Sequence, residues 1–290
     1  MTTTHPLARR IARRFVAGET IEDALAVTRE LHRRGAGAEI DYLGENVHSP
    51  EQATASASAY LELIDRLTTV GTEAHVSLKP TQMGLAIDPE LCFRNVTEVV
   101  ERAAAPETLV WLDMEASEYT DRTLDLYRRV RADHENVGVA IQAYLHRSKA
   151  DVQALLSVGG TVRLCKGAYM EPASVAIQDK TGVDNNFMVL ADMLLSSRRY
   201  QAIATHDEKM IRHVVKFARA NGIDSAAYEF HLLYGVRRDL QLRLLREGYR
   251  VRIYVPFGQE WYPYFMRRLA ERPANLVFLV SSLAREAKAA

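Results

Sequence analysis

Three cationic side chains in this sequence, Lys79, Arg267 and Arg268, could together bind one small carboxylate. A guanidinium group donates two parallel hydrogen bonds in one plane, which suits a carboxylate. Each hydrogen bond to a charged group contributes about 1.5–3 kcal/mol, so three could anchor a small acid. The alternative is a basic surface turn, in which Arg267 pairs with Glu271 four residues further on.

Polar side chains also end several short apolar runs of the chain. They are Lys79, Asp113, Gln142, Arg163, His206 and Tyr254. A strand-end salt bridge or a solvated loop charge explains each of them equally well when it is taken alone. Six such residues, from six predicted strands, are better explained by one shared site.

The elements that would bring these residues together are eight apolar, β-branched runs, each followed by a helix-length amphipathic stretch. The runs end near residues 45, 79, 113, 142, 166, 206, 231 and 254. Such alternation favours parallel strands joined by right-handed crossovers, and eight units can close into a TIM-type (β/α)8 barrel. Active sites of these barrels lie at the carboxyl ends of the strands. We therefore predict an α/β fold of this type.

The hydrophobic pattern predicts extra helices before the first strand, near residues 5–17 and 20–34, and a first strand at about 39–44. Later helices are expected near 51–70, 88–104, 118–134, 147–157, 171–197, 207–221, 236–247 and 260–271. Pro50 and Pro89 fit first turns, and Asp207 can cap a helix. The longest irregular stretch, from Gly167 to about Asp184, would lie at the active-site end.

Length and composition fit one catalytic domain, residues 1–290, with an N-terminal helical segment at 1–38, the barrel at 39–280 and a tail at 281–290. The 37 basic and 37 acidic residues balance, so no bulk field favours nucleic acid. Cys92 and Cys165 lack the spacing of a metal site or disulfide framework. No apolar run reaches the roughly 18 residues that span a membrane, so we expect a cytoplasmic protein, with peripheral association with the inner membrane left open.

Seven motifs occur in order over nearly the whole chain. They are DYLGE (41–45), LDMEAS (112–117), QAY (142–144), RLCKGAY (163–169), ATH (204–206), EFHLLYG (229–235) and YVPFG (254–258), followed by Arg267 and Arg268. Each motif is weak alone, but seven with compatible spacing are specific. Together they resemble the proline dehydrogenase family.

The resemblance implies a distorted (β/α)8 barrel that uses FAD to oxidise L-proline to 1-pyrroline-5-carboxylate and passes the electrons to a quinone-type acceptor. By motif match, Asp113 would be the carboxylate of the catalytic centre, and Arg163 would lie by the reactive flavin nitrogen. The matched substrate residues are Lys79, Arg267 and Arg268 for the carboxylate, and Tyr169, Leu233 and Tyr254 for the ring.

The resemblance also implies cofactor contacts and a gate. The matched flavin contacts are Met114, Gln142, Arg163, Lys166, Gly167, Ala168, Thr205 and His206. Glu45 matches a carboxylate that, in the family, pairs with one of the helix arginines when substrate is bound, and Glu271 is a second gate candidate. We expect the aldehyde-oxidising module of bifunctional relatives to be absent and a separate 1-pyrroline-5-carboxylate dehydrogenase to act on the product.

The sequence departs from the family pattern at a few positions. Cys165 and His231 stand where valine and glutamine are common, and Pro-Thr-Gln follows Lys79 in place of Leu-Ser-Ala. We interpret His231 as a tolerated polar substitution and leave a proton role open.

Two other functions could use the same side chains. A metal-dependent hydrolase would use His206, His231, Asp113 and a carbamylated Lys166. Barrel hydrolases of that kind usually carry His-x-His at the first strand, where this chain has Asp-Tyr-Leu (41–43). A Schiff-base lyase would use Lys79 or Lys166 as its nucleophile. A non-catalytic binding barrel is disfavoured by the density of ionisable groups at the strand ends.

Overall fold

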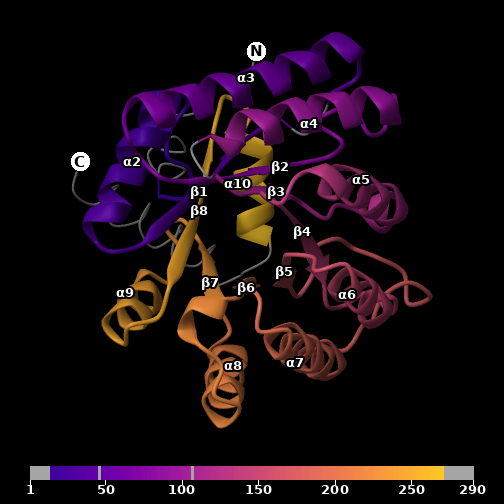
Figure 1. The fold of residues 1–290 in the computed structure, drawn as a ribbon, viewed down its shortest axis with the longest axis vertical. Coiled ribbons are helices and arrows are strands. Elements are labelled where there is room, and N and C mark those ends of the chain that lie inside the picture. The colour runs from indigo at the N-terminus through magenta and orange to yellow at the C-terminus, as the bar shows by residue number, and fades with distance from the viewer. Residues whose placement is uncertain (1–13, 45–46, 106–107, 271–290) are drawn as a thin grey trace, which may run out of the picture.

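Eight parallel strands form the centre of the structure, and helices surround them (Figure 1). The computed structural model describes residues 14–44, 47–105 and 108–270, with the side chains of Phe265 and of residues 267–270 outside that description. Each strand pairs in parallel with the next, and β8 pairs with β1, so the sheet closes into a barrel. The predicted (β/α)8 fold is confirmed.

The strands are short, and most of their residues are buried. In chain order they are β1 (Gly37–Tyr42), β2 (His75–Leu78), β3 (Val110–Leu112), β4 (Val137–Gln142), β5 (Val162–Cys165), β6 (Gln201–Ala204), β7 (Tyr228–Leu233) and β8 (Val251–Phe257). Because all eight are parallel, their carboxyl ends lie at one end of the barrel. We call this end the mouth.

The helices lie outside the strands. They are α2 (Ile21–Arg33), α3 (Pro50–Thr69), α4 (Pro89–Ala104), α5 (Thr120–Asp133), α6 (Ser148–Ser157), α7 (Lys180–Ser196), α8 (Glu208–Ala220), α9 (Arg238–Arg246) and α10 (Trp261–Ala270), with the short 3-10 helices η1 (Ser117–Tyr119) and η2 (Ser225–Ala227). Pro50 and Pro89 occupy first turns as predicted. Asp207 caps α8 by accepting a hydrogen bond from the Lys209 N–H at 2.9 Å.

Two expected helices differ from the structure. The helix expected near 5–17 lies largely outside the described residues, and its described end, residues 14–17, is not helical. The helix expected at 171–197 begins at Lys180, because Asp179 is extended and caps it by accepting from the Gly182 N–H at 2.6 Å. The segment before it is irregular, as the sequence predicted, and a bridge between Leu145 and Ala176 holds part of it.

The outward-facing side chains of the strands are apolar and pack against the helices. Ile40, Leu78, Leu112, Leu164 and Ile203 are fully buried members of one large cluster that includes the inner faces of the helices. Burying an aliphatic side chain of this size contributes roughly 1.5–3 kcal/mol relative to exposure. The outer face of the barrel is therefore the main apolar core.

The inward-facing side chains are largely polar. Glu39 on β1 pairs with Arg163 on β5, and Lys79, directly after β2, contacts Tyr254 on β8. These strands are not neighbours in the sheet, so the contacts cross the barrel interior. Alternation along a strand could not tell which face points inward, and these contacts answer that question.

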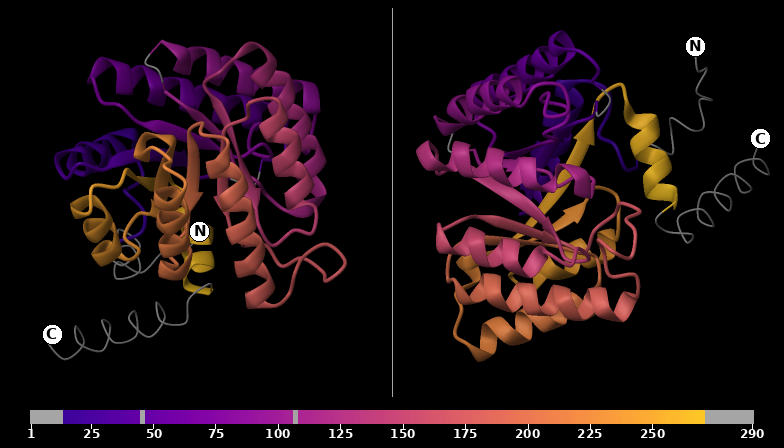
Figure 2. Two further views of the ribbon diagram at one scale, coloured as in Figure 1. Left: turned by 60° about the horizontal axis from the view of Figure 1, so that its bottom comes forward. Right: turned by 90° about the vertical axis from the view of Figure 1, so that its right-hand side faces the viewer.

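Helix α10 lies across the mouth end of the barrel (Figure 2). Its residues Trp261 and Tyr264 pack with Leu43 and Val236, which follow β1 and β7, and with Phe15. The helix that carries the predicted arginine pair is therefore placed beside the strand ends. No helix in the described ranges has the length and apolar character that spanning a bilayer requires.

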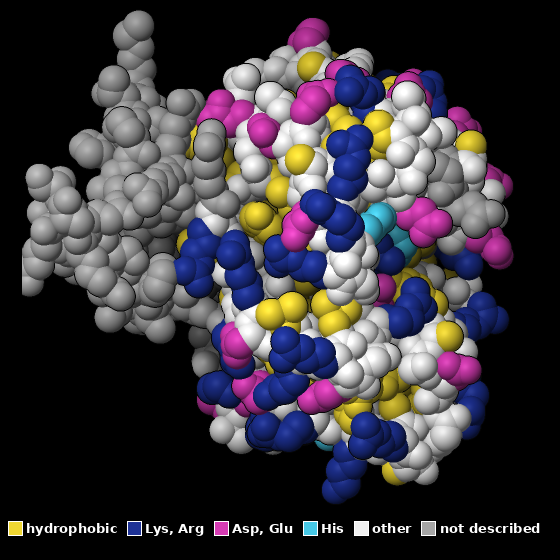
Figure 3. Space-filling model, turned by 90° about the vertical axis from the view of Figure 1, so that its left-hand side faces the viewer, with side chains coloured by type: hydrophobic (Ala, Val, Ile, Leu, Met, Phe, Trp, Pro, Cys, Tyr) yellow, Lys and Arg dark blue, Asp and Glu magenta, His cyan; other side chains and the backbone are white. Residues whose placement is uncertain are grey.

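The outer surface mixes both signs of charge. Figure 3 shows Lys and Arg side chains spread over the side that carries α2 and α9, with Asp and Glu side chains among them. Surface ion pairs include Arg34 with Glu30 on α2, at 2.6 Å, and Arg243 of α9 with Glu208, at 3.0 Å. On the described part of this face Lys and Arg side chains are the more numerous, and acidic side chains lie among them.

Candidate active site

Four side chains at the mouth contact one another, and we call them the mouth cluster: Asp41, Lys79, Asp113 and Tyr254. Lys79 Nζ lies 3.0 Å from Asp113 Oδ2, 3.3 Å from Asp41 Oδ1 and 3.4 Å from Tyr254 Oη. The Tyr254 hydroxyl donates to Asp113 Oδ2 at 3.1 Å. Asp113 therefore holds both the lysine and the tyrosine that the sequence placed in the site.

Arg163 lies beside the mouth cluster, inside the barrel. Its guanidinium forms ion pairs with Asp113 and Glu39 and donates to Ser77 Oγ at 3.3 Å. It also lies 5.2 Å from the centroid of the Trp111 ring, at cation–π distance. Because ionic and aromatic contacts restrain it from several sides, Arg163 is a fixed positive charge next to the site.

The charges of the cluster set the ionisation of its members. Burial by itself raises the pKa of Asp113, but Lys79 and Arg163 outweigh burial and hold that pKa well below its usual range. Burial and the charge of Asp113 raise the pKa of Tyr254 well above its ordinary value. Asp113 is therefore an ionised organiser at neutral pH, and Tyr254 keeps its proton.

The side chains matched to flavin contacts lie at the ends of β3 to β6. Gln142 Nε2 donates to the main-chain oxygen of Glu115 at 2.8 Å. The main-chain N–H of Leu233 donates to His206 Nε2 at 3.0 Å, which fixes the imidazole at the end of β6. The other matched residues there are Met114 and Thr205, which are buried, and Ala168, which is exposed.

The turn after β5 has two features that constrain its shape. Lys166 Nζ forms ion pairs with Asp184 and, at 2.7 Å, with Asp207. Gly167 has φ +114°, and a β-carbon at that position would overlap the ring of Tyr144. Only glycine adopts this backbone conformation readily, so the turn requires it.

Cys165 ends β5 between Arg163 and this turn. Burial raises the pKa of the Cys165 thiol to about 11, so the side chain stays protonated at neutral pH. It therefore behaves as a small packed side chain and not as a nucleophile.

Several predicted site residues are not tested by the described contacts. Glu45, Glu271 and the side chains of Arg267 and Arg268 lie outside the described residues. Tyr169 stands on the segment between β5 and α7 with 37% of its surface exposed, and Leu233 packs against the cluster of Trp261 and Tyr264. Packing of these two side chains around a substrate ring stays a prediction.

Three residues of the site were not assigned a role from the sequence: Glu39, Asp41 and Ser77. Glu39 and Asp41 lie two residues apart on β1, so they share a face of that strand. Charged residues alternating with apolar ones in a buried strand were the available signal. Ser77 gave no such signal, although its hydroxyl donates to Asp113 Oδ1 at 2.6 Å.

The irregular segment after β5 is tied to the segment after β3. Glu171 accepts hydrogen bonds from the main-chain N–H of Ser117 at 2.7 Å and from its hydroxyl at 2.6 Å. The tie joins the segments that follow β3 and β5, which β4 separates, and it lies two residues after Tyr169. It restricts where the tyrosine can lie.

The contacts of the candidate ligands do not suit the hydrolase or the Schiff-base lyase. His231 lies between two carboxylates inside the barrel, whereas His206 accepts a hydrogen bond at the end of β6. Lys79 and Lys166 are both engaged in ion pairs that suit an ammonium group. Within the described part of the chain, no group of three His, Cys, Asp or Glu side chains is placed to hold a metal ion.

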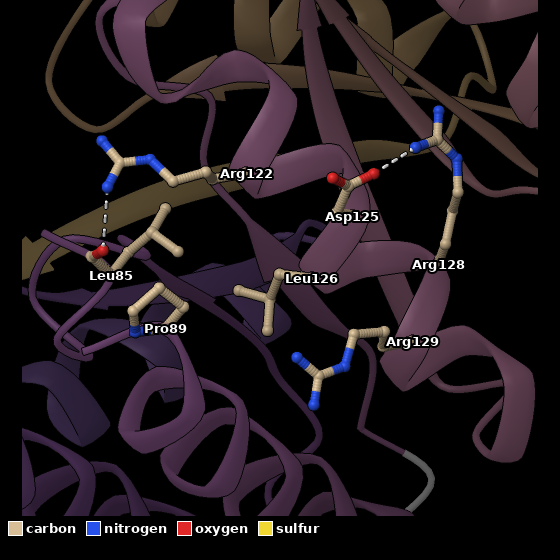
Figure 4. A pocket seen from close by; sticks show the side chains of 7 residues that line it. All are labelled: Leu85, Pro89, Arg122, Asp125, Leu126, Arg128 and Arg129. Carbon is tan, nitrogen blue, oxygen red and sulfur yellow. Dashed lines mark hydrogen bonds and ion pairs between the residues drawn. The ribbon is translucent and has the colours of Figure 1, made fainter.

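A hollow of about 500 Å³ lies outside the barrel, between α4 and α5 (Figure 4). Its lining residues are Leu85, Pro89, Arg122, Asp125, Leu126, Arg128 and Arg129. Arg128 pairs with Asp125 at 2.7 Å, and Arg129 pairs with Glu90 at 2.7 Å. The hollow contains none of the predicted site residues, and its arginines are engaged with the protein.

A closed barrel of eight parallel strands, with a buried cluster of charged groups at the strand ends, has the architecture of a (β/α)8 enzyme. The model of one family, proline dehydrogenase, matches residues 24–281. The chain is 39% identical over 272 residues to proline dehydrogenase 1 of Bacillus subtilis, covering 94% of this chain and 90% of the relative. It is 40% identical over 278 residues to the proline dehydrogenase of Deinococcus radiodurans, with coverage of 94% and 90%.

Solved structures share the fold. Proline utilization A from Bdellovibrio bacteriovorus, inactivated by N-propargylglycine, superimposes with a TM-score of 0.85 at 24% identity, over 90% of this chain and 32% of that one. The chain belongs to the proline dehydrogenase family. Its activity is the oxidation of proline, in proline catabolism.

Proposed function

We propose that this protein transfers a hydride from L-proline to FAD, forming 1-pyrroline-5-carboxylate, and that the electrons then pass to a quinone-type acceptor. One catalytic domain, with its barrel at residues 39–280, would carry the reaction. The observation that supports the proposal is the mouth cluster with Arg163 beside it. It combines a cation for a carboxylate, an aromatic ring for the pyrrolidine and a fixed charge for the cofactor.

The residues at the ends of β4 to β6 fit a flavin. Arg163 and Lys166 supply positive charge, and Gln142 and His206 supply polar groups along the same side of the mouth. The backbone at Gly167 carries no side chain, so a cofactor can approach the turn closely. We propose that these residues hold FAD.

The chemistry that FAD supplies when bound is the acceptance of a hydride. Lys79, Arg267 and Arg268 would bind the proline carboxylate, and Tyr254 would pack against the ring. Holding both ends of so small a molecule aims the carbon next to the nitrogen in one direction, which is a proximity and orientation effect. Asp113 would keep Lys79 and Tyr254 in place, through contacts of 3.0 and 3.1 Å.

The proline nitrogen must be neutral when the hydride leaves, because its lone pair forms the new C=N bond. Lys79 and Arg163 disfavour a protonated amine nearby, since like charges repel. Arg163 would also stabilise the negative charge that develops during reduction. Asp113 stays ionised and offsets part of this positive charge, so its role is to organise the cluster.

A steady-state assay tests the proposal. The purified protein, saturated with FAD, is supplied with L-proline and a soluble quinone, and the formation of 1-pyrroline-5-carboxylate is measured with a trapping reagent. We expect product only when FAD and proline are both present. Product formation without flavin, or at the same rate after flavin removal, would refute the cofactor assignment.

A further inference from the structure

Beneath the mouth cluster, a second group of buried charged side chains fills the barrel, and we call it the lower cluster: Glu39, His231, Glu229 and Arg252. His231 Nδ1 lies 2.9 Å from Glu39 Oε2, and its Nε2 lies 3.2 Å from Glu229 Oε2. Arg252 Nε donates to Glu229 Oε2 at 2.7 Å. The exposed fractions are 0% for Glu39, 3% for Glu229 and 4% for His231.

Glu39 is shared between the lower cluster and Arg163. One of its carboxylate oxygens forms an ion pair with Arg163, and the other faces His231. The indole of Trp111 meets the His231 ring edge-to-face at 5.6 Å and lies 5.2 Å from the Arg163 guanidinium. His231 therefore acts on Arg163 through a carboxylate and through an aromatic ring.

The two clusters and Arg163 balance in charge when His231 is a cation. The carboxylates are Glu39, Asp41, Asp113 and Glu229, and the permanent cations are Lys79, Arg163 and Arg252. Arg250 lies 3.9 Å from Glu229 but is 44% exposed, so solvent screens its charge and it is left out of the sum. The buried groups then count four against three, and a cationic His231 makes the sum four against four. Both ring nitrogens of His231 lie close to carboxylate oxygens, Nδ1 at 2.9 Å from Glu39 and Nε2 at 3.2 Å from Glu229, so two negative charges flank the imidazole.

The neighbouring groups support this distribution of charge. Burial by itself raises the pKa of Glu39, but Arg163 and His231 outweigh burial and hold that pKa at about 2. Burial and the nearby Arg252 lower the pKa of His75 well below its usual value, so His75 is neutral. Among the described residues, other titratable groups near the lower cluster include Tyr200 and Arg250, which contact Glu229, and Asp113, whose charge acts on Glu39.

We propose that Glu39 and His231 are positioning residues for proline oxidation, because they fix Arg163 and set the net charge beneath the flavin. The inference rests on the proposed function, in which Arg163 lies beside FAD. An uncompensated negative charge there disfavours the addition of electrons, and an uncompensated positive charge favours it. Substitutions of the two residues should therefore shift the flavin reduction potential in opposite directions.

The experiment measures the midpoint potential of the FAD-loaded protein and of each variant at one fixed pH. His231→Gln leaves three cations against four carboxylates, so we expect a lower potential. Glu39→Gln leaves four cations against three carboxylates, so we expect a higher potential. A tenfold change in the ratio of reduced to oxidised flavin corresponds to about 30 mV for a two-electron couple.

The double variant, Glu39→Gln with His231→Gln, tests whether the two charges compensate each other. It leaves three cations against three carboxylates, so its potential should return toward that of the unaltered protein.

In each single variant, kcat for proline should change more than KM, because Arg163 acts on the reduction step and Lys79 on binding. A general loss of structure would shift the two single variants in the same direction.

Matched controls come from outside the barrel. His213→Gln removes an imidazole that contacts Asp192 at 2.7 Å on the helical layer, and Glu90→Gln removes an exposed partner of Arg129. Neither should change the potential. The unfolding midpoint of each flavin-free variant provides a second readout that does not depend on the cofactor.

Each outcome is decisive. Opposite shifts in the single variants with recovery in the double variant support the proposal. The proposal is overturned if all variants have equal midpoint potentials, or if both single variants shift in the same direction. In either case proline must still reduce the unaltered protein. If proline fails to reduce the unaltered FAD-loaded protein, the proposed function itself fails, which is a different result.

Discussion

The inner and outer faces of this barrel differ sharply, although they are made by alternate residues of the same strands. On β1, Ile40 points outward into the apolar cluster, whereas Glu39 and Asp41 point inward to Arg163 and Lys79. All three of these side chains are fully buried. Burial alone therefore does not distinguish core from site, but the chemistry of the partner does.

The comparison shows how one sheet supports two tasks. The interiors of such barrels are usually filled with branched apolar side chains. Here the helices cover the outer face with the main apolar core, and much of the interior holds paired charges. Alternate residues of a strand point to opposite faces. A substitution at an outward-facing position should therefore affect stability, and a substitution at the next, inward-facing position should affect the chemistry of the site.

The largest expected effect is on the outer face. Ile40→Ala removes a fully buried side chain and should lower the free energy of unfolding by about 2–5 kcal/mol, measured by denaturant titration. The kcat/KM per folded molecule should stay the same. A large fall in kcat/KM with an unchanged free energy of unfolding would contradict the assignment of Ile40 to the apolar core and not to the site.

Acid should destabilise the inner face first. The folded-state pKa of Glu39 is about 2 against an ordinary 4.5, so its contribution is present above about pH 4.5 and is lost as pH falls toward 2. The shift corresponds to about 3 kcal/mol. Glu39→Gln should remove this part of the pH dependence in unfolding experiments, and an unaltered acid profile in that variant would count against the ion pairs.

Substitution of the predicted carboxylate contacts should change kinetics. Lys79→Met or Arg268→Met removes one charge-assisted contact and should cost about 1.5–3 kcal/mol in kcat/KM for proline. The loss should be much smaller for a proline amide, which lacks the charged carboxylate. Equal losses for proline and its amide would remove these residues from the proposed carboxylate site.

The aromatic side of the site should set selectivity more than rate. Tyr254 limits the space at the ring, so 4-hydroxyproline should be a poor substrate. Tyr254→Ser should narrow the preference for proline over 4-hydroxyproline about tenfold, or roughly 1.4 kcal/mol. Unaltered selectivity in this variant would show that Tyr254 does not contact the ring.

The smallest expected effect is on the solvent-facing side of the helices. Arg66 of α3 pairs with Glu22 of α2 at 2.7 Å, and both side chains are exposed. Arg66→Ala should change the free energy of unfolding by roughly 0–1 kcal/mol and leave the kinetics unchanged. A larger effect would mean that the outer layer contributes through charge as well as through apolar contact.

The sequence predicted the barrel well because its signal is local. Apolar runs and amphipathic stretches report strands and helices directly, and prolines such as Pro50 and Pro89 mark helix starts. The start of α7 was misplaced because it depends on one capping side chain, Asp179, within a long polar stretch. Alternation could not assign the inner face, since that depends on how the sheet closes.

The site was predicted in part for the same reason. Lys79, Asp113, Arg163 and Tyr254 stand at strand ends, where the fold itself brings them together. The pairing of Glu39 with His231 joins β1 to β7 across the barrel, and no local pattern reports such a contact. His231 was interpreted as a tolerated substitution, yet the structure places it between two carboxylates.

One measurement tests the central claim most directly: anaerobic titration of the FAD-loaded protein with L-proline, followed by flavin absorbance. We predict that proline bleaches the oxidised flavin band and that Lys79→Met needs a proline concentration roughly 10–100 times higher for the same effect. An unchanged flavin spectrum at saturating proline, or identical titrations for the two proteins, would contradict the account.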